Sequence, residues 1–495
     1  MNTITTPTLA DPDLLQEQLF IDGDWRPASD GARLDVLDPA TGDRVAAVAC
    51  ATAEDASSAI AAARRAGPGW ARLTAKARSE VLRRWYDLIV GHVDDLAVIL
   101  TSEQGKPLAE AKGEILYGAG FIEWYAEEAK RAYGETIPTN ADGRRLFVLK
   151  QPVGVCGAIT PWNFPAAMIH RKVGPALAAG CTMVLKPASE TPLSALAMTE
   201  LARRAGVPAG VLNVVHGDPE VVGGELMRSP DVRMVTFTGS TDVGRLLIAQ
   251  SAPTVKRLSL ELGGNAPLIV FDDADLDRAV EGTMASKFRN AGQTCVCANR
   301  ILVQTGVHDA FVERLVRETR RLRVGNGFDA GVEQGPLIDT GAVEKVEAHI
   351  TDAVARGGQV ACGGRRHDLG GTFFEPTVVT GASADMRLAR EETFGPLAPV
   401  FRFEAEAEAV ALANDTESGL AAYLFSRDVG RVWRVGEALE FGVVGVNTGA
   451  FSYEGAPFGG IKQSGSGREG SRHGLDDFLE LKYMCLDGID DGGGA

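Results

Sequence analysis

From Pro152 onward, short runs of apolar and β-branched residues alternate with stretches of helical periodicity. A run that is apolar throughout is typical of a strand buried on both faces, and strands joined by helices lie parallel to one another. The alternation therefore predicts an α/β fold with a parallel sheet covered by helices on both sides. Predicted strands lie at 153–159, 181–185, 211–215 and 232–237, and predicted helices at 166–179, 193–204, 219–227 and 243–250.

A second series of the same kind begins near residue 266. Strands are predicted at 266–271 and 301–304, and helices at 276–287 and 310–322. An earlier helix is predicted at 53–66, where Thr52 and Asp55 have the spacing of a capping pair. A chain of 495 residues has room for roughly two to four domains, so the second series predicts a second α/β domain.

Composition excludes several classes of protein. Apolar residues make up 45% and charged residues 23%, as in a globular protein. The net charge of −16 argues against a nucleic-acid partner, and no apolar run approaches the ~20 residues that span a bilayer. The seven cysteines are scattered, without a CxxC pair, and the histidines lack metal-ligand spacing, so neither a disulfide framework nor a metal site is expected. The first residues resemble neither a secretory signal nor a transit peptide, and we expect a cytoplasmic protein.

Cys295 is the first candidate for chemistry. It follows Gly292, Gln293 and Thr294 on a loop between a predicted helix and a predicted strand. Loops held by rigid elements often carry reactive groups, and a thiolate is a strong nucleophile. The same string is equally compatible with a small buried cysteine.

Polar residues follow three predicted strands. Glu261 stands at a strand end before two glycines, and it is interpreted either as a general base or as a solvated carboxylate. Asn163 lies in a turn between two prolines, and its side chain is interpreted either as an oxyanion donor or as part of an Asx-turn. Gly239, Ser240 and Gly244 lie at a strand-to-helix turn, where backbone amides can approach a phosphate.

Lys186 and Ser189 follow another predicted strand. Their side chains are able to hold a hydroxyl or a phosphate, although an ordinary polar loop has the same composition.

Together these strings resemble the aldehyde dehydrogenase superfamily. They occur in its order: PWNFP, KPAS, FTGSTDVG, LELGGN, GQTC, EETFGP and PFGG. The resemblance extends from about residue 19 to about residue 485. The strings KFRN and CVC around Cys295, and KQSGSGREGS from residue 462, are similar to the succinate-semialdehyde dehydrogenase branch. Ser466 is a small departure, because relatives tend to carry leucine there.

The resemblance implies a reaction in which Cys295 attacks the aldehyde carbon. The Asn163 side chain and the Cys295 backbone N–H then match the donors of an oxyanion hole for the thiohemiacetal. Hydride transfer to a nicotinamide coenzyme leaves a thioester, and Glu261 matches the base that activates water to hydrolyse it. A CoA-acylating enzyme often lacks that glutamate, and a non-catalytic binding protein is expected to have lost one of these three residues.

The resemblance also implies coenzyme-binding residues, and it favours NADP over NAD while leaving NAD possible. Relatives that prefer NAD place a glutamate where this chain has Ser189, and that glutamate would repel a 2′-phosphate. Lys186 and Ser189 can donate to the phosphate instead. The full set of matched coenzyme residues is Trp162, Lys186, Ser189, Gly239, Ser240, Gly244, Glu392 and Phe394.

Arg171, Arg289 and Ser452 match residues that hold the distal carboxylate of succinate semialdehyde in the branch, which implies a place in GABA degradation. Arginine suits a carboxylate because its planar fork offers paired donors, although either arginine could lie in a structural ion pair. Glutarate semialdehyde is one methylene longer and stays open, as does a broader aldehyde specificity. Cys297 matches the partner of a redox switch with Cys295, or is a small packing residue.

The resemblance finally implies three structural parts. A Rossmann-type coenzyme domain comprises residues 1–130 and 150–264, and an α/β catalytic domain comprises residues 265–448. A small β-hairpin at 131–149 joins a strand at 478–490 as an oligomerisation element, in a homodimer or a homotetramer.

Overall fold

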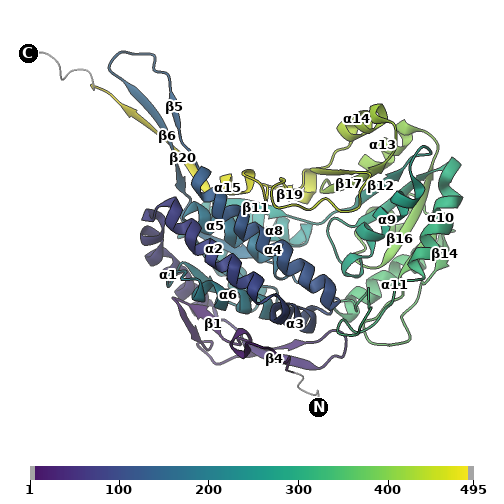
Figure 1. The fold of residues 1–495 in the computed structure, drawn as a ribbon, viewed down its shortest axis with the longest axis horizontal. Helices are drawn as coiled ribbons and strands as arrows, with labels where there is room; N and C mark the ends of the chain where they lie inside the picture. The colour runs from purple at the N-terminus through teal and green to yellow at the C-terminus, as the bar shows by residue number, and fades with distance from the viewer. Residues whose placement is uncertain (1–5, 489–495) are drawn as a thin grey trace, which may run out of the picture.

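The computed structural model describes residues 6–488. Figure 1 shows two α/β bodies side by side and a narrow β-hairpin that projects away from the first of them. The chain passes from the first body to the second near residue 262 and returns to the first body before its C-terminal strand.

The first body is built on an eight-stranded sheet. Its five central strands are parallel, and each predicted strand of the first series is present within two residues of its predicted ends. The sheet order is β19 (Gly465–Ser466), β11 (Arg257–Glu261), β10 (Val232–Thr238), β7 (Val155–Ile159), β8 (Thr182–Lys186), β9 (Leu212–Val214), β1 (Leu19–Ile21) and β2 (Asp24–Arg26).

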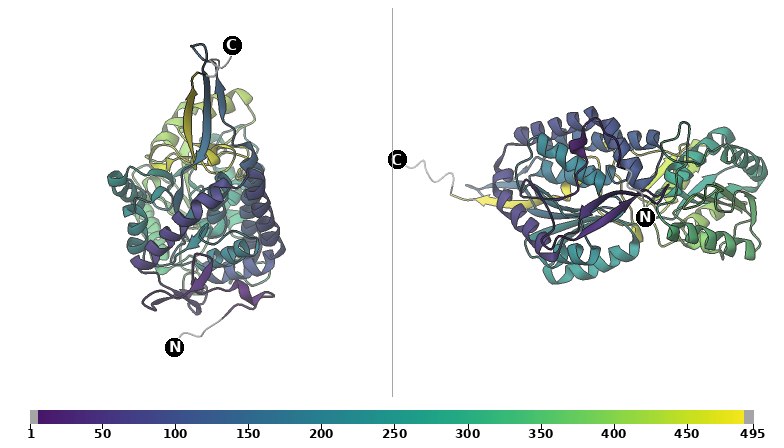
Figure 2. Two further views of the ribbon diagram at one scale, coloured as in Figure 1. Left: turned by 90° about the vertical axis from the view of Figure 1, so that its left-hand side faces the viewer. Right: turned by 90° about the horizontal axis from the view of Figure 1, so that it is seen from below.

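Helices cover both faces of this sheet, as predicted (Figure 2). Alternate side chains of each strand enter opposite cores: Cys156 and Ala158 of β7 face one, and Val155 faces the other. The first core includes α2 (Ala75–Gly91), α3 (Val93–Gln104), α4 (Leu108–Glu128), α5 (Ala167–Ala179) and α6 (Leu193–Arg204); the second includes α1 (Ala53–Arg72), α7 (Pro219–Arg228) and α8 (Thr241–Ser251).

Several helix ends differ from the prediction, including both ends of α10 (Thr305–Thr319). This helix begins five residues and ends three residues before the predicted bounds of 310–322. Helix α1 continues six residues past the predicted end and through Pro68, because Trp70 is buried and its indole N–H donates to the Leu177 carbonyl at 3.0 Å. Helix α8 begins two residues early, because the Ser240 hydroxyl caps it by accepting from the Val243 amide at 3.3 Å.

The second body contains a seven-stranded sheet, which agrees with the second predicted series. Only β14 runs antiparallel to its neighbour. The order is β14 (Gln359–Cys362), β15 (Thr377–Thr380), β16 (Leu397–Phe403), β13 (Ala298–Gln304), β12 (Ala266–Val270), β17 (Ala421–Phe425) and β18 (Val443–Val446). Helices α9 (Leu276–Lys287) and α10 (Thr305–Thr319) cover one face; α11 (Thr340–Ala355), α12 (Arg387–Arg390), α13 (Glu406–Asn414) and α14 (Val429–Ala438) pack on the other.

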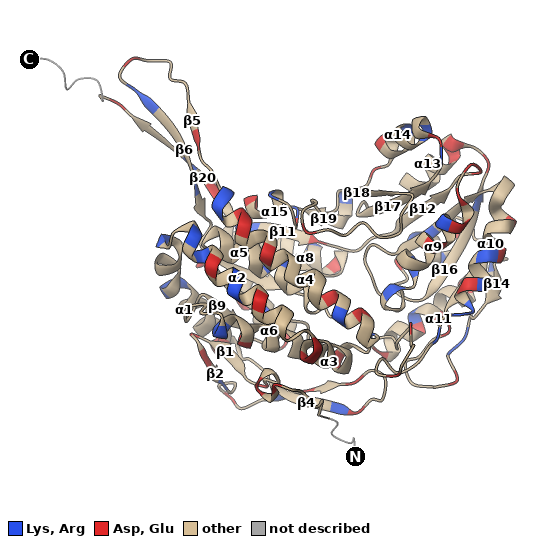
Figure 3. Cartoon of the chain, in the orientation of Figure 1, with Lys and Arg blue, Asp and Glu red and all other residues tan. Residues whose placement is uncertain are grey.

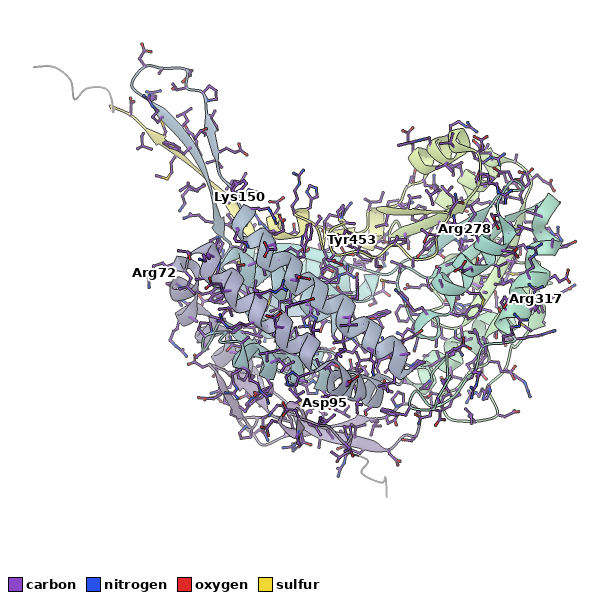
Figure 4. All side chains as sticks on the ribbon, in the orientation of Figure 1. Arg72, Asp95, Lys150, Arg278, Arg317 and Tyr453 are labelled. Carbon is purple, nitrogen blue, oxygen red and sulfur yellow. The ribbon has the colours of Figure 1, made fainter. Side chains whose placement is uncertain are left out.

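The projecting hairpin consists of β5 (Glu135–Ile137) and β6 (Arg145–Pro152), and β20 (Leu479–Leu486) pairs with β6 along its length. At its base Lys150, labelled in Figure 4, donates to Asp476 of the short helix α15 (His473–Asp476) at 2.7 Å. Residues 489 and 490 of the predicted element lie outside the described residues. Its role in oligomerisation stays a prediction, as do the domain boundaries.

The remaining strands, β3 (Arg33–Leu37) and β4 (Arg44–Ala49), form a separate antiparallel pair. Figure 3 shows that basic and acidic residues are interspersed along the helices of both bodies. Within residues 6–488, no helix is long and apolar enough to cross a membrane.

Candidate active site

The candidate site lies where the carboxyl edge of the first sheet faces the amino edge of the second. Only residues 262–265 separate the end of β11 from the start of β12, so Glu261 stands at this junction. In the first sheet β7 lies beside both β8 and β10, so successive crossovers leave in opposite directions there. Such a switch point is where ligands bind in open α/β sheets.

Cys295 lines two cavities at once. One, of about 300 Å³, is here called the inner cavity, and the other, of about 420 Å³, is called the switch-point cavity. Asn163 and Glu261 also line the switch-point cavity, so the structure brings the three predicted catalytic residues together. A thiol between two cavities is able to meet a substrate from one side and a coenzyme from the other.

The Cys295 loop is conformationally strained. Asn290 and Ala291 both have positive φ, at 52° and 55°, which is costly for residues with a Cβ. The loop is held by the Glu110 carboxylate, which accepts from the Asn290 amide at 3.1 Å, and by Gln293, whose side chain accepts from the Ile338 amide at 2.9 Å. These contacts fix the loop that presents the Cys295 thiol.

Burial, with Glu392 nearby, raises the pKa of Cys295 to about 12, although Arg171 opposes the shift. The resting residue is therefore a thiol, and its reaction requires a proton acceptor. Glu261 is suited to accept that proton, because burial and the neighbouring Glu469 raise its pKa well above the usual range. Neither oxygen of the Glu261 carboxylate has a hydrogen-bond partner within residues 6–488.

Two N–H groups are placed to receive an oxyanion. One hydrogen of the Asn163 side-chain amide is used, because its Nδ2 donates to the Gln293 carbonyl at 3.0 Å, and the other donates to no residue between 6 and 488. The Cys295 backbone N–H donates no hydrogen bond to any described residue. Free donors beside a nucleophile have the chemistry of an oxyanion hole.

Five of the predicted coenzyme residues line the switch-point cavity: Trp162, Gly239, Ser240, Glu392 and Phe394. The rings of Trp162 and Phe394 meet edge to face at 5.5 Å between centroids. The Glu392 carboxylate accepts from the Gly264 amide at 3.2 Å, and burial raises the pKa of Glu392 to about 7. Stacking surfaces, a carboxylate and the N-terminus of α8 fit a nicotinamide dinucleotide.

The other three predicted coenzyme residues do not line this cavity. Lys186 is buried at the end of β8, and its ammonium donates to the Pro187 carbonyl at 3.0 Å. Ser189 lies three residues further along. Gly244 allows close packing of α8, since a Cβ there would lie 2.6 Å from the side chain of Leu262. Their roles in coenzyme binding stay predictions.

Arg171, Arg289 and Ser452 all line the inner cavity. Ser452 precedes Tyr453, which Figure 4 labels on the segment between the two bodies. Arg171 is buried and forms an ion pair with Glu469 at 2.6 Å, but its Nη2 has no hydrogen-bond partner among the described residues. Arg289 is exposed and lies over the Phe164 ring at 5.1 Å. Arg171 thus combines the structural ion pair with a free donor.

Cys297 is buried. Its thiol donates to the Gly292 carbonyl at 3.3 Å and lies 3.6 Å from the Lys287 ammonium. A redox role for it stays a prediction. Within the described part of the chain, no group of three or more histidine, cysteine or acidic residues is arranged to hold a metal.

Sequence reasoning missed the polar wall of the inner cavity on α4. Glu110, Gly113, Glu114 and Tyr117 line it at helical spacing. That spacing, in a helix otherwise rich in apolar residues, was the signal available. Glu469 was also missed, because nothing local to its sequence marks a carboxylate that pairs with α5.

The comparisons with known proteins agree with this geometry. Residues 25–484 match the aldehyde dehydrogenase family. The chain is 61% identical to succinate-semialdehyde dehydrogenase [NADP(+)] GabD of Escherichia coli K12 over 97% of this chain and 99% of that protein. It is 60% identical to glutarate-semialdehyde dehydrogenase of Pseudomonas aeruginosa over 97% of this chain and all of that protein. A crystal structure described as an E. coli NADP-dependent enzyme superposes with a TM-score of 0.96 at 61% identity, over 97% of this chain and all of that one. Because the family match and the relatives extend over almost the whole chain, this chain belongs to the aldehyde dehydrogenase family.

Proposed function

We propose that the protein oxidises succinate semialdehyde to succinate with NADP as the preferred coenzyme. The observation that supports this substrate is the pair of arginines, Arg171 and Arg289, in the inner cavity. Cys295 lines the same cavity. An arginine fork with free donors suits a carboxylate at the far end of an aldehyde. The E. coli relative named for the same reaction supports the assignment.

The chain's own residues account for the steps of acyl transfer. Glu261 accepts the proton of Cys295, whose sulfur adds to the aldehyde carbon. The Asn163 amide and the Cys295 N–H stabilise the oxyanion of the resulting thiohemiacetal. A bound nicotinamide coenzyme supplies the hydride acceptor. Once Glu261 has released that proton to solvent, it takes a proton from water, whose oxygen attacks the thioester carbon. The C–S bond then breaks, which releases the acid and regenerates Cys295.

The coenzyme preference rests on Ser189 and Lys186, whose side chains are able to donate to a 2′-phosphate and carry no negative charge to repel it. The E. coli relative, which is named for NADP(+), supports the same choice. Replacing Ser189 by glutamate should lower kcat/KM for NADP and raise it for NAD. A wild-type enzyme that strongly prefers NAD would overturn this part of the proposal.

Glutarate semialdehyde is the second candidate substrate, because a relative of nearly equal identity is named for it. One methylene changes pocket binding by only about 1–3 kcal/mol. Reduction of NADP at 340 nm, compared for succinate semialdehyde, glutarate semialdehyde and butanal, tests both candidates. The two acids should greatly exceed butanal, and equal rates with butanal would remove the carboxylate role of Arg171 and Arg289.

We also propose that the enzyme is a cytoplasmic homodimer or homotetramer joined through the three-stranded hairpin. Tyr133, Leu481 and Tyr483 are 70%, 69% and 59% exposed there, which is unusual for large apolar residues in a monomer. Light scattering on the wild type and on L481E/Y483E tests the assembly. An unchanged mass in the variant would exclude the hairpin from the interface.

A further inference from the structure

The backbone carbonyl of Asn163 is a junction between two side chains from distant parts of the chain. The Lys106 ammonium donates to this oxygen at 2.8 Å, and the side-chain amide of Asn290 donates to it at 2.9 Å. Lys106 comes from the link between α3 and α4, whereas Asn290 belongs to the Cys295 loop. Both donors are buried, each with 2% of its surface exposed. One oxygen therefore joins the Asn163 turn to the Cys295 loop.

Lys106 is itself fixed by a buried ion pair. Its ammonium contacts the Glu114 carboxylate at 2.5 Å, and each side chain is only 1% exposed. The other Glu114 oxygen accepts from the backbone amides of Ala166 and Ala167, at 2.9 and 3.2 Å, where α5 begins. The Phe164 ring also lies 4.0 Å from the ammonium. The ion pair thus forms hydrogen bonds with both ends of the turn from Asn163 to Ala167.

A buried ion pair adds little net stability, since the desolvation of both charges offsets their attraction. The presence of this ion pair beside two loops is better explained by the groups that it holds in place. The direction of the Asn163 side chain depends on the orientation of the Asn163 peptide, which Lys106 and Asn290 hold from two sides. An oxyanion donor must be placed to within a fraction of an ångström to be effective.

We propose that Lys106, held by Glu114, is a positioning residue for the oxyanion hole. It lines the inner cavity, but its ammonium is directed to the Asn163 carbonyl and the Glu114 carboxylate, and through them it fixes the Asn163 turn against the Cys295 loop. This inference rests on the proposed function. Because it concerns the developing oxyanion, it applies to every aldehyde that the enzyme oxidises, with or without a distal carboxylate.

A double-mutant cycle with K106M and N163A tests this role, using NADP and both succinate semialdehyde and butanal. K106M alone should lower kcat by about 10- to 100-fold on both substrates, with the KM for NADP unchanged. In the N163A background K106M should change kcat by about twofold or less, because the donor that it positions is already absent.

Lys256 provides a matched control. It is a buried lysine whose ammonium also donates to two backbone carbonyls, those of Ser229 and Val232, each at 2.9 Å, and it lines neither cavity. K256M should retain the wild-type kcat. Alkylation of Cys295 by iodoacetamide should proceed at the wild-type rate in K106M, which a generally disrupted site would not allow.

Three results would overturn the proposal. An equal loss from K106M in both backgrounds would show that Lys106 acts independently of Asn163. A loss confined to succinate semialdehyde would make Lys106 a contact of the substrate carboxylate, and a slowed alkylation of Cys295 would make it a structural support of the nucleophile. If K106M does not fold, K106M/E114Q carries the same cycle, since it removes both charges and keeps an acceptor for the α5 amides. Wild-type inactivity on all the aldehydes would instead refute the proposed function.

Discussion

Replacing Arg171 by methionine should weaken both folding and substrate binding, whereas replacing Arg289 by alanine should weaken binding alone. The difference follows from burial. Arg171 is 3% exposed in its side chain and pairs with the buried Glu469, whereas Arg289 is exposed and forms no ion pair in the described structure. Breaking a buried ion pair typically costs about 3–5 kcal/mol.

The cost for Arg171 should fall at the lower end, about 3 kcal/mol. Glu469 keeps a second partner, because Lys172 contacts its other oxygen at 2.5 Å. Removing exposed Arg289 should change the free energy of unfolding by about 0–1 kcal/mol. For binding, the loss of a hydrogen bond to a charged group costs about 1.5–3 kcal/mol. Each variant should therefore lose roughly 10- to 100-fold in kcat/KM for succinate semialdehyde.

Urea unfolding followed by tryptophan fluorescence measures the first effect, and kcat/KM for succinate semialdehyde against butanal measures the second. The reasoning is refuted if R171M unfolds at the wild-type urea concentration, or if both variants lose equally on the two aldehydes. The first result would mean that the Glu469 pair does not stabilise the fold. The second would mean that the arginines do not recognise the carboxylate.

Two further predictions concern pH. Burial raises the pKa of Glu103 to about 8 while it caps α6 by accepting from the Leu193 and Ser194 amides. The folded state then binds a proton that the unfolded state releases, so stability should fall as pH rises from about 4.5 to about 8, and E103Q should reduce that fall in urea unfolding. With the pKa of Glu392 at about 7, its carboxylate is lost as pH falls through 7. The KM for NADP should rise as pH falls through 7, and E392Q should abolish this pH dependence. An equal rise of KM in E392Q would exclude Glu392 as the origin of the pH dependence.

Much of the fold was predictable because it depends on local pattern. Helices α6 and α9 begin and end at the predicted residues, and both parallel sheets were expected from apolar runs separated by helices. The chemical candidates were also predictable, since Cys295, Glu261 and Asn163 each occupy a loop or strand end with a distinctive composition. Asn163 and Glu261 share the switch-point cavity because the carboxyl ends of parallel strands meet at one edge, whereas Cys295 reaches it from the loop before β13, at the amino edge of the second sheet.

Sequence by itself thus determined the element types, their order and the residues able to react. Only the tertiary structure decided which of them meet. Arg171 pairs with Glu469, almost 300 residues away, and the Lys106 ammonium donates to the backbone carbonyl of Asn163. Lys186, Ser189 and Gly244 do not line the switch-point cavity, although Trp162 and Gly239 do. The physical reason is that burial and hydrogen bonding between distant segments depend on how the two bodies pack, and local periodicity carries no record of that packing.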